Sequence, residues 1–167
     1  YPYVCMGVFV LGSLIRFDRD QYTWRSGSSQ LLRSRQFAIG SNLFHFGVLF
    51  LFFGHFVGLL TPHWAYEWLI SPALKQKVAI TAGGIAGAIC FVGLTMLLHR
   101  RLFDPRIRRT STRIDITILA LLWVQLTLGL VTLPFSLGHS DGGAMLQLSA
   151  WSQAIVTFRP GAADLIH

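Results

Sequence analysis

Two histidines, His45 and His55, lie ten residues apart in a segment that otherwise consists mainly of Phe, Leu, Val and Gly. An ionisable side chain within a long apolar segment is costly to place in lipid, so such positions are the first candidates for function. An imidazole in this setting can form a hydrogen bond in a packed core, relay a proton, or ligate haem iron through a ring nitrogen.

The spacing of the two histidines separates these possibilities in part. On one helix, ten residues place the imidazoles roughly 15 Å apart along the axis and about 80° apart around it. They cannot share one metal, and each falls in a different half of a ~30 Å hydrocarbon layer. This arrangement suits two haems stacked across a bilayer, each ligated by one of the two histidines. We therefore favour cofactor ligation, with proton relay or packing as the alternatives.

Three cations lie near the ends of apolar segments. Lys75 precedes the third segment and could meet an anionic or carbonyl-bearing ligand, or it could be a surface lysine that reaches the headgroups. Arg100 and Arg101 follow the same segment and could pair with haem propionates or with phospholipid headgroups.

The elements that must position these residues are membrane helices. Apolar residues make up 53% of the chain and charged residues only 13%, a composition that argues against a water-soluble enzyme. Thirteen Phe, five Trp and four Tyr also exclude a disordered chain. The only cysteines, Cys5 and Cys90, have no paired spacing and are predicted to be small packing residues.

Four apolar segments are predicted to span the membrane, at residues 1–15, 37–60, 78–98 and 114–133. Proline is expected to end the second segment at Pro62 and the fourth at Pro134. The fold class is thus an all-α, membrane-embedded helical bundle. Residues 134–167 are expected to form an outer-face loop with an interfacial helix near 146–158.

Two further patterns concern the second and third segments. Glycines 40, 47, 54 and 58 form one stripe nearly opposite His45, which predicts close approach of a neighbouring backbone. After Pro62, Trp64, Tyr66 and Trp68 are typical of an aromatic belt at the membrane interface.

The net charge is +7, and the positively charged residues are distributed unevenly among the loops. Five arginines lie between the first and second segments and six between the third and fourth, whereas the other two loops carry two lysines and one arginine. This alternation predicts that 16–36 and 99–113 are cytoplasmic and that 61–77 and 134–167 face outward. A nucleic-acid partner is not expected; the expected surroundings are membrane lipid.

Short motifs along the whole chain also match a known family. They are residues 20–25 (DQYTWR), 41–45 (SNLFH), 54–56 (GHF), 60–64 (LTPHW), 75–77 (KQK), 100–103 (RRLF) and 156–158 (VTF). On these motifs the chain resembles the gamma subunit of bacterial respiratory nitrate reductase.

The resemblance implies a cytochrome b anchor of five helices in the bacterial cytoplasmic (inner) membrane, holding two b haems. Such an anchor oxidises quinol near the outer face and passes electrons to an iron-sulfur (beta) subunit. Nitrate is then reduced on a molybdenum-containing (alpha) subunit at the cytoplasmic side. A related dihaem anchor serving a disulfide or sulfite reductase is the nearest alternative, and a cofactor-free scaffold or transporter is the alternative from another class.

The resemblance also implies roles for individual residues. His45 would ligate the haem nearer the cytoplasm and His55 the haem nearer the quinol, with Gly54, His55 and Lys75 lining the quinol site. Arg101 would pair with a haem propionate. The second ligand of each haem would come from a fifth helix after residue 167, so the resemblance implies that 1–167 is a single cytochrome b domain truncated at both ends.

Overall fold

The computed structural model describes residues 1–20, 22, 34–138, 142–162 and 164, and its regular elements there are all helical. This confirms the predicted all-α class. The elements are α1 (Pro2–Asp20), α2 (Ser34–Leu60), the 3-10 helix η2 (His63–Ala65), α3 (Pro72–Phe103), α4 (Pro105–Thr110), α5 (Arg113–Gly138) and α6 (Gly143–Val156).

Three helices in the described part of the chain, α2, α3 and α5, are long and apolar enough to cross a membrane. They contain 27, 32 and 26 residues, so each exceeds the ~30 Å hydrocarbon layer at 1.5 Å per residue. The fourth predicted span, residues 1–15, lies in α1 and is not one of them. Arg16, Asp18, Arg19 and Asp20 crowd the end of this 19-residue helix, which leaves too short an apolar run.

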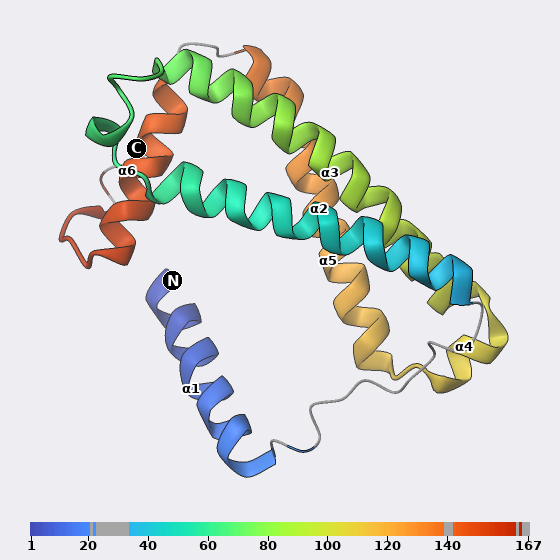
Figure 1. Cartoon of the computed structure of the whole chain (residues 1–167). Helices are drawn as coiled ribbons and strands as arrows, with labels where there is room; N and C mark the ends of the chain where they lie inside the picture. The colour runs from blue at the N-terminus through green and yellow to red at the C-terminus, as the bar shows by residue number, and fades with distance from the viewer. Residues whose placement is uncertain (21, 23–33, 139–141, 163, 165–167) are drawn as a thin grey trace.

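The long helices lie together, with α2 alongside α3 and α5 packed on α3 (Figure 1). The C-terminal end of α2, η2, the start of α3 and α6 lie at one end of this group, called here the α6 end. The short helix α4 lies at the opposite end, called the α4 end. Helix α1 stands apart, and its Tyr3 ring stacks on Phe158 at a centroid distance of 5.3 Å.

Helix α3 begins six residues earlier than predicted, at Pro72. Ser71 is its N-cap, because the Ser71 hydroxyl accepts a hydrogen bond from the Leu74 N–H at 3.3 Å. Proline is favoured directly after such a cap, since its fixed φ suits a first helical residue. Lys75 therefore lies within the first turns of α3 and not in the preceding loop.

The prediction that Pro134 ends its helix was wrong, because α5 continues through it to Gly138. Proline removes one backbone donor, but membrane helices tolerate it where neighbouring polar groups satisfy the carbonyls. The helix bond that Pro134 cannot make is the one to the Leu130 carbonyl. Nearby hydroxyls bond other carbonyls, Thr132 to that of Gly129 at 2.7 Å and Ser136 to that of Thr132 at 3.1 Å.

The prediction that the glycines of α2 allow a neighbouring helix to come close was correct for two of the four. A Cβ on Gly47 would lie 2.5 Å from the Cys90 Cβ, and a Cβ on Gly40 would lie 3.2 Å from the Met96 Cβ, so both glycines allow α3 to come close. Gly54 and Gly58 have nothing within 4 Å of such a Cβ. Cys90 is a buried packing residue as predicted.

Two smaller expectations have mixed outcomes. Cys5 is exposed, so the prediction that it is a packing residue was wrong for the part of the chain that the structure describes. The helix expected near 146–158 is present as α6, and its placement at the membrane surface stays a prediction.

Candidate functional site

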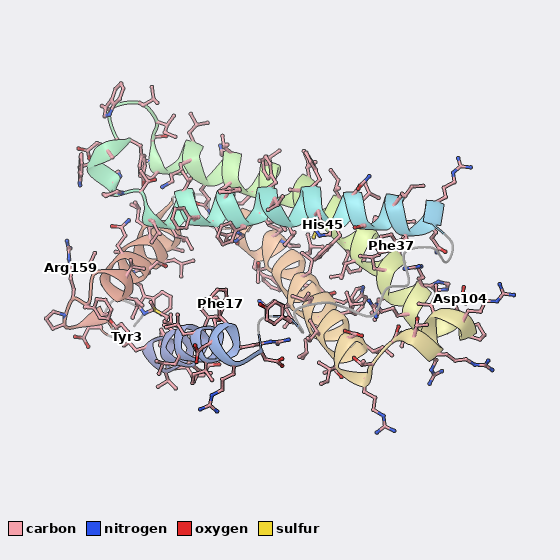
Figure 2. The ribbon with its side chains drawn as sticks, turned by 60° about the horizontal axis from the view of Figure 1, so that its bottom comes forward. Tyr3, Phe17, Phe37, His45, Asp104 and Arg159 are labelled. Carbon is pink, nitrogen blue, oxygen red and sulfur yellow. The ribbon has the colours of Figure 1, made fainter. Side chains whose placement is uncertain are left out.

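Both histidines project from α2, and both side chains are exposed (His45 is labelled in Figure 2). His45 Nδ1 lies 2.7 Å from the Ser41 carbonyl oxygen, and His55 Nδ1 lies 2.7 Å from the Leu51 carbonyl oxygen. A carbonyl can only accept, so this geometry assigns the proton of each ring to Nδ1. In the neutral form of each ring, Nε2 is therefore the nitrogen left to act as a ligand.

This donor set fits a haem iron. Histidine ligands to metals usually donate the other ring N–H to a carbonyl, which orients the ring and raises the basicity of the ligating nitrogen. Phe44 contacts the His45 ring edge-on at 5.3 Å, and Phe52 and Phe56 stack at 6.1 Å on the turns around His55. Apolar rings beside a neutral imidazole form suitable walls for a porphyrin.

No group of three or more His, Cys, Asp or Glu side chains in the described ranges could hold a metal ion by itself. That each histidine serves a different iron stays a prediction from their spacing on α2.

Lys75 is brought to α2 at the α6 end. Its Nζ donates to the Gly58 carbonyl at 3.0 Å and lies 3.7 Å from the centre of the Tyr66 ring. Gly58 is three residues after His55 and one turn after Gly54. Lys75 of α3 therefore contacts the same end of α2 on which Gly54 and His55 lie. The side chain is partly buried, and its ammonium is held by contacts within the chain.

Helix α6 also contacts this end of α2. Gln153 Nε2 donates to the Leu59 carbonyl at 3.0 Å and to the Thr61 carbonyl at 3.3 Å. The Ser149 hydroxyl donates to the Gly58 carbonyl at 3.5 Å. The last carbonyls of a helix have no partner within it, so these side chains, together with Lys75, satisfy the C-terminus of α2.

Tyr66 differs from the other two aromatic residues of the expected interfacial belt. Its side chain is only 9% exposed, whereas Trp64 and Trp68, expected in the same interfacial belt, are 73% and 78% exposed. The alternation of aromatic residues gave no sign of which ring turns inward, because that depends on how η2 and the following turn pack against α3.

Arg101 lies at the α4 end, away from Lys75. Its Nη1 donates to the Ser111 hydroxyl at 3.0 Å and lies 3.4 Å from Asp115 Oδ2. Asp115 also accepts a hydrogen bond from the Thr112 N–H at 3.0 Å. The same carboxylate therefore caps the start of α5 and pairs with Arg101. The pairing of Arg101 with a haem propionate stays a prediction.

The neighbouring Arg100 is 3% exposed, and its guanidinium lies 4.8 Å from the Phe37 ring centre. This contact joins the two helices α2 and α3 at the α4 end. Most of the 20–25 motif and His167 lie outside the described residues.

Comparison with known proteins gives consistent matches over the whole chain. The model of the family described as nitrate reductase gamma subunit matches residues 1–167. The chain is 52% identical over 164 residues to the respiratory nitrate reductase 1 gamma chain of Escherichia coli strain K12, covering 98% of this chain and 73% of that protein. It is 50% identical over 167 residues to the respiratory nitrate reductase 2 gamma chain of the same strain, covering 100% and 74%. Identity to the nitrate reductase gamma chain of Bacillus subtilis strain 168 is 38% over 163 residues, covering 97% and 73%.

Proposed function

Because the chain belongs to the nitrate reductase gamma subunit family, we propose that it oxidises membrane quinol near the outer face and delivers the electrons to a cytoplasmic iron-sulfur subunit. As a gamma chain with several membrane-length helices, it is a multi-pass subunit of a respiratory nitrate reductase complex in the bacterial cytoplasmic membrane. The observation that carries the proposal is the pair of histidines on α2 that each direct Nδ1–H to a carbonyl and leave Nε2 for a ligand.

We assign one b haem to His45 and one to His55. When bound, the haems supply one-electron carriers between the two faces of the membrane. The chain holds each imidazole in one tautomer through its carbonyl partner, and the neighbouring phenylalanines offer apolar surface to a bound porphyrin. Arg101 at the α4 end is the proposed partner of a haem propionate.

The quinol site is proposed at the α6 end, around Gly54, His55 and Lys75. An ammonium has three N–H donors. One of them is directed to the Gly58 carbonyl and another faces the Tyr66 ring, so a third can donate to a quinol oxygen. Lys75 therefore orients the quinol, and its positive charge makes the bound hydroxyl more acidic.

The reaction is the two-electron oxidation of the quinol to a quinone. Both quinol O–H bonds break, the two protons leave to the outer water, and the two electrons leave one at a time toward the cytoplasmic side. In this proposal the water at the outer face takes both protons, and Lys75 acts only as a hydrogen-bond donor. Charge separation across the membrane follows when the acceptor lies on the opposite face.

The partners proposed for the α4 end are the iron-sulfur (beta) subunit and, beyond it, the molybdenum-containing (alpha) subunit. This end carries Arg100, Arg101, Arg106, Arg108, Arg109 and Arg113, as expected for the cytoplasmic side.

The test is the absorbance spectrum of the full-length chain purified with its complex. Reduction with dithionite should give the sharp alpha bands of b haem, and His45→Ala and His55→Ala should each remove one of two haems. The His55→Ala variant should also lose quinol oxidation. A spectrum without haem bands, or haem content unchanged in the double variant, would overturn the proposal and favour a cofactor-free bundle.

A further inference from the structure

We infer that Tyr66 is a positioning residue for Lys75: the face of its buried ring and the Gly58 carbonyl together hold the ammonium ready for a quinol oxygen. This inference rests on the proposed quinol site and names a residue that acts through Lys75 without touching the quinol. It assigns a function to the one aromatic of the η2 loop that turns inward.

The position of the Tyr66 ring is set by its own turn. The Tyr66 N–H donates to the His63 carbonyl at 3.2 Å, and the Tyr66 carbonyl accepts from the N–H groups of Leu69 and Ile70 at 2.9 and 3.0 Å. These bonds hold the backbone on both sides of the residue. The ring, 9% exposed, is thereby directed toward the start of α3 and away from the interface.

The His63 imidazole fixes a second side of the ring. It contacts Tyr66 edge-on at a centroid distance of 5.2 Å, and its Nε2 lies 3.5 Å from Glu67 Oε2. The Tyr66 ring is thus held between an imidazole of its own loop and the ammonium of α3. A ring held in this way can restrain a flexible partner.

Lys75 needs such a restraint. A lysine side chain has four rotatable bonds, and ordering it for a ligand costs conformational entropy. Its Nζ is 3.7 Å from the Tyr66 ring centre, well inside the ~6 Å range of cation–π attraction, and 3.0 Å from the Gly58 carbonyl. These partners come from two different elements, so together they define one position of the ammonium.

The charge of Lys75 also stays available to a ligand. Neither contact neutralises it, since a ring face and a carbonyl are both uncharged, and no carboxylate pairs with Lys75 within the described ranges. An anionic partner such as Asp or Glu would compete with the quinol oxygen for the same N–H donors. Tyr66 restrains the ammonium without that competition.

The experiment compares Tyr66→Phe with Tyr66→Leu in the full-length chain assembled with its complex. The probes are menadiol as substrate and a fluorescent hydroxyquinoline N-oxide as quinol analogue. Tyr66→Phe keeps the ring face and should match the wild type. Tyr66→Leu should raise both KM and the Kd of the analogue roughly three- to tenfold, with little change in kcat or in the haem spectrum.

Trp64→Leu is the matched control, because it removes an exposed aromatic from the same loop and should leave both constants unchanged. Wild-type constants in Tyr66→Leu would overturn the inference. Equal losses in Tyr66→Phe and Tyr66→Leu would also overturn it, because the hydroxyl and not the ring face would then be responsible.

Two further measurements keep the result independent of folding and of the proposed quinol site. If Tyr66→Leu assembles poorly, fluorinated phenylalanines at position 66 weaken the ring face while keeping its shape, and the Kd should rise with each added fluorine. In a double-mutant cycle, Tyr66→Leu should add nothing to Lys75→Ala. If Lys75→Ala itself leaves analogue binding unchanged, the quinol site is wrong; if only Tyr66→Leu has no effect, this inference alone fails.

Discussion

At the residue scale, the histidines and Lys75 differ in how they are held. Each imidazole is oriented by a carbonyl four residues earlier in the same helix, at 2.7 Å. This bond is local and follows from the helix geometry. The Lys75 ammonium is instead held by Gly58 and Tyr66, which are 17 and 9 residues away in the sequence. The lysine therefore depends on the packing of the loop, whereas the histidines do not.

Lys75→Ala should weaken quinol binding and leave both haems in place. A hydrogen bond to a charged group contributes ~1.5–3 kcal/mol, so KM for menadiol should rise roughly ten- to a hundredfold. Steady-state kinetics and the reduced haem spectrum measure the two effects separately. Lys77→Ala, which removes an exposed lysine two residues further on, is the control and should behave as wild type. An unchanged KM in Lys75→Ala would remove this residue from the site.

At the scale of elements, the crossing of α2 and α3 is the closest contact among the helices described. Gly93 allows no Cβ, because one built there would collide with the backbone of Phe44 and Gly40. Gly47 meets Cys90 in the same way. Since lipid offers no hydrophobic driving force for helix association, close packing of small residues has to hold such a pair together. The crossing fixes how α2 presents its histidines.

Gly47→Ala should destabilise this crossing. The added Cβ would lie 2.5 Å from the Cys90 Cβ, and overpacking of this kind costs roughly 1–3 kcal/mol. Denaturation in detergent, followed through haem absorbance, should show a lower midpoint. Gly129→Ala is a suitable control, because nothing lies within 4 Å of a Cβ there and alanine favours the helix. Equal stability of the two variants would contradict the close approach of α2 and α3.

At the scale of the whole molecule, the distribution of charge predicts the orientation in the membrane. The α4 end contains the arginine-rich connection between α3 and α5, whereas the α6 end carries Lys75, Lys77 and Arg159. In Figure 2, Asp104 and Arg159 lie at opposite ends of the molecule. The proposed quinol site at the α6 end is therefore predicted to lie near the outer face.

This orientation predicts which cysteine probes react from outside. In a background with Cys5→Ser, a membrane-impermeant maleimide should label Arg159→Cys in intact spheroplasts. The reagent should not label Arg109→Cys until the membrane is opened. Both positions are exposed, so access and not burial decides the result. Labelling of Arg109→Cys in intact spheroplasts would reverse the orientation and move the proposed quinol site to the cytoplasmic face.

The amino-acid sequence alone determined the helical class, the approximate positions of three long spans and the separation of His45 from His55. These features follow from composition and from the rise and turn of one helix, which are local and nearly constant. The helix ends were less predictable. Pro134 lies inside α5, because the loss of one helix hydrogen bond does not by itself end a membrane helix, and a rule based on proline alone therefore placed this end too early.

Only the tertiary structure decided which glycines meet another helix, which aromatic of the η2 loop turns inward, and where the Lys75 ammonium lies. Gly47 and Gly54 are seven residues apart on one helix, yet only the first faces α3, because two crossing helices approach closely at one region and then diverge. Contacts between elements depend on such crossing geometry, which is set by all the packed side chains together and not by the spacing of residues along any one segment.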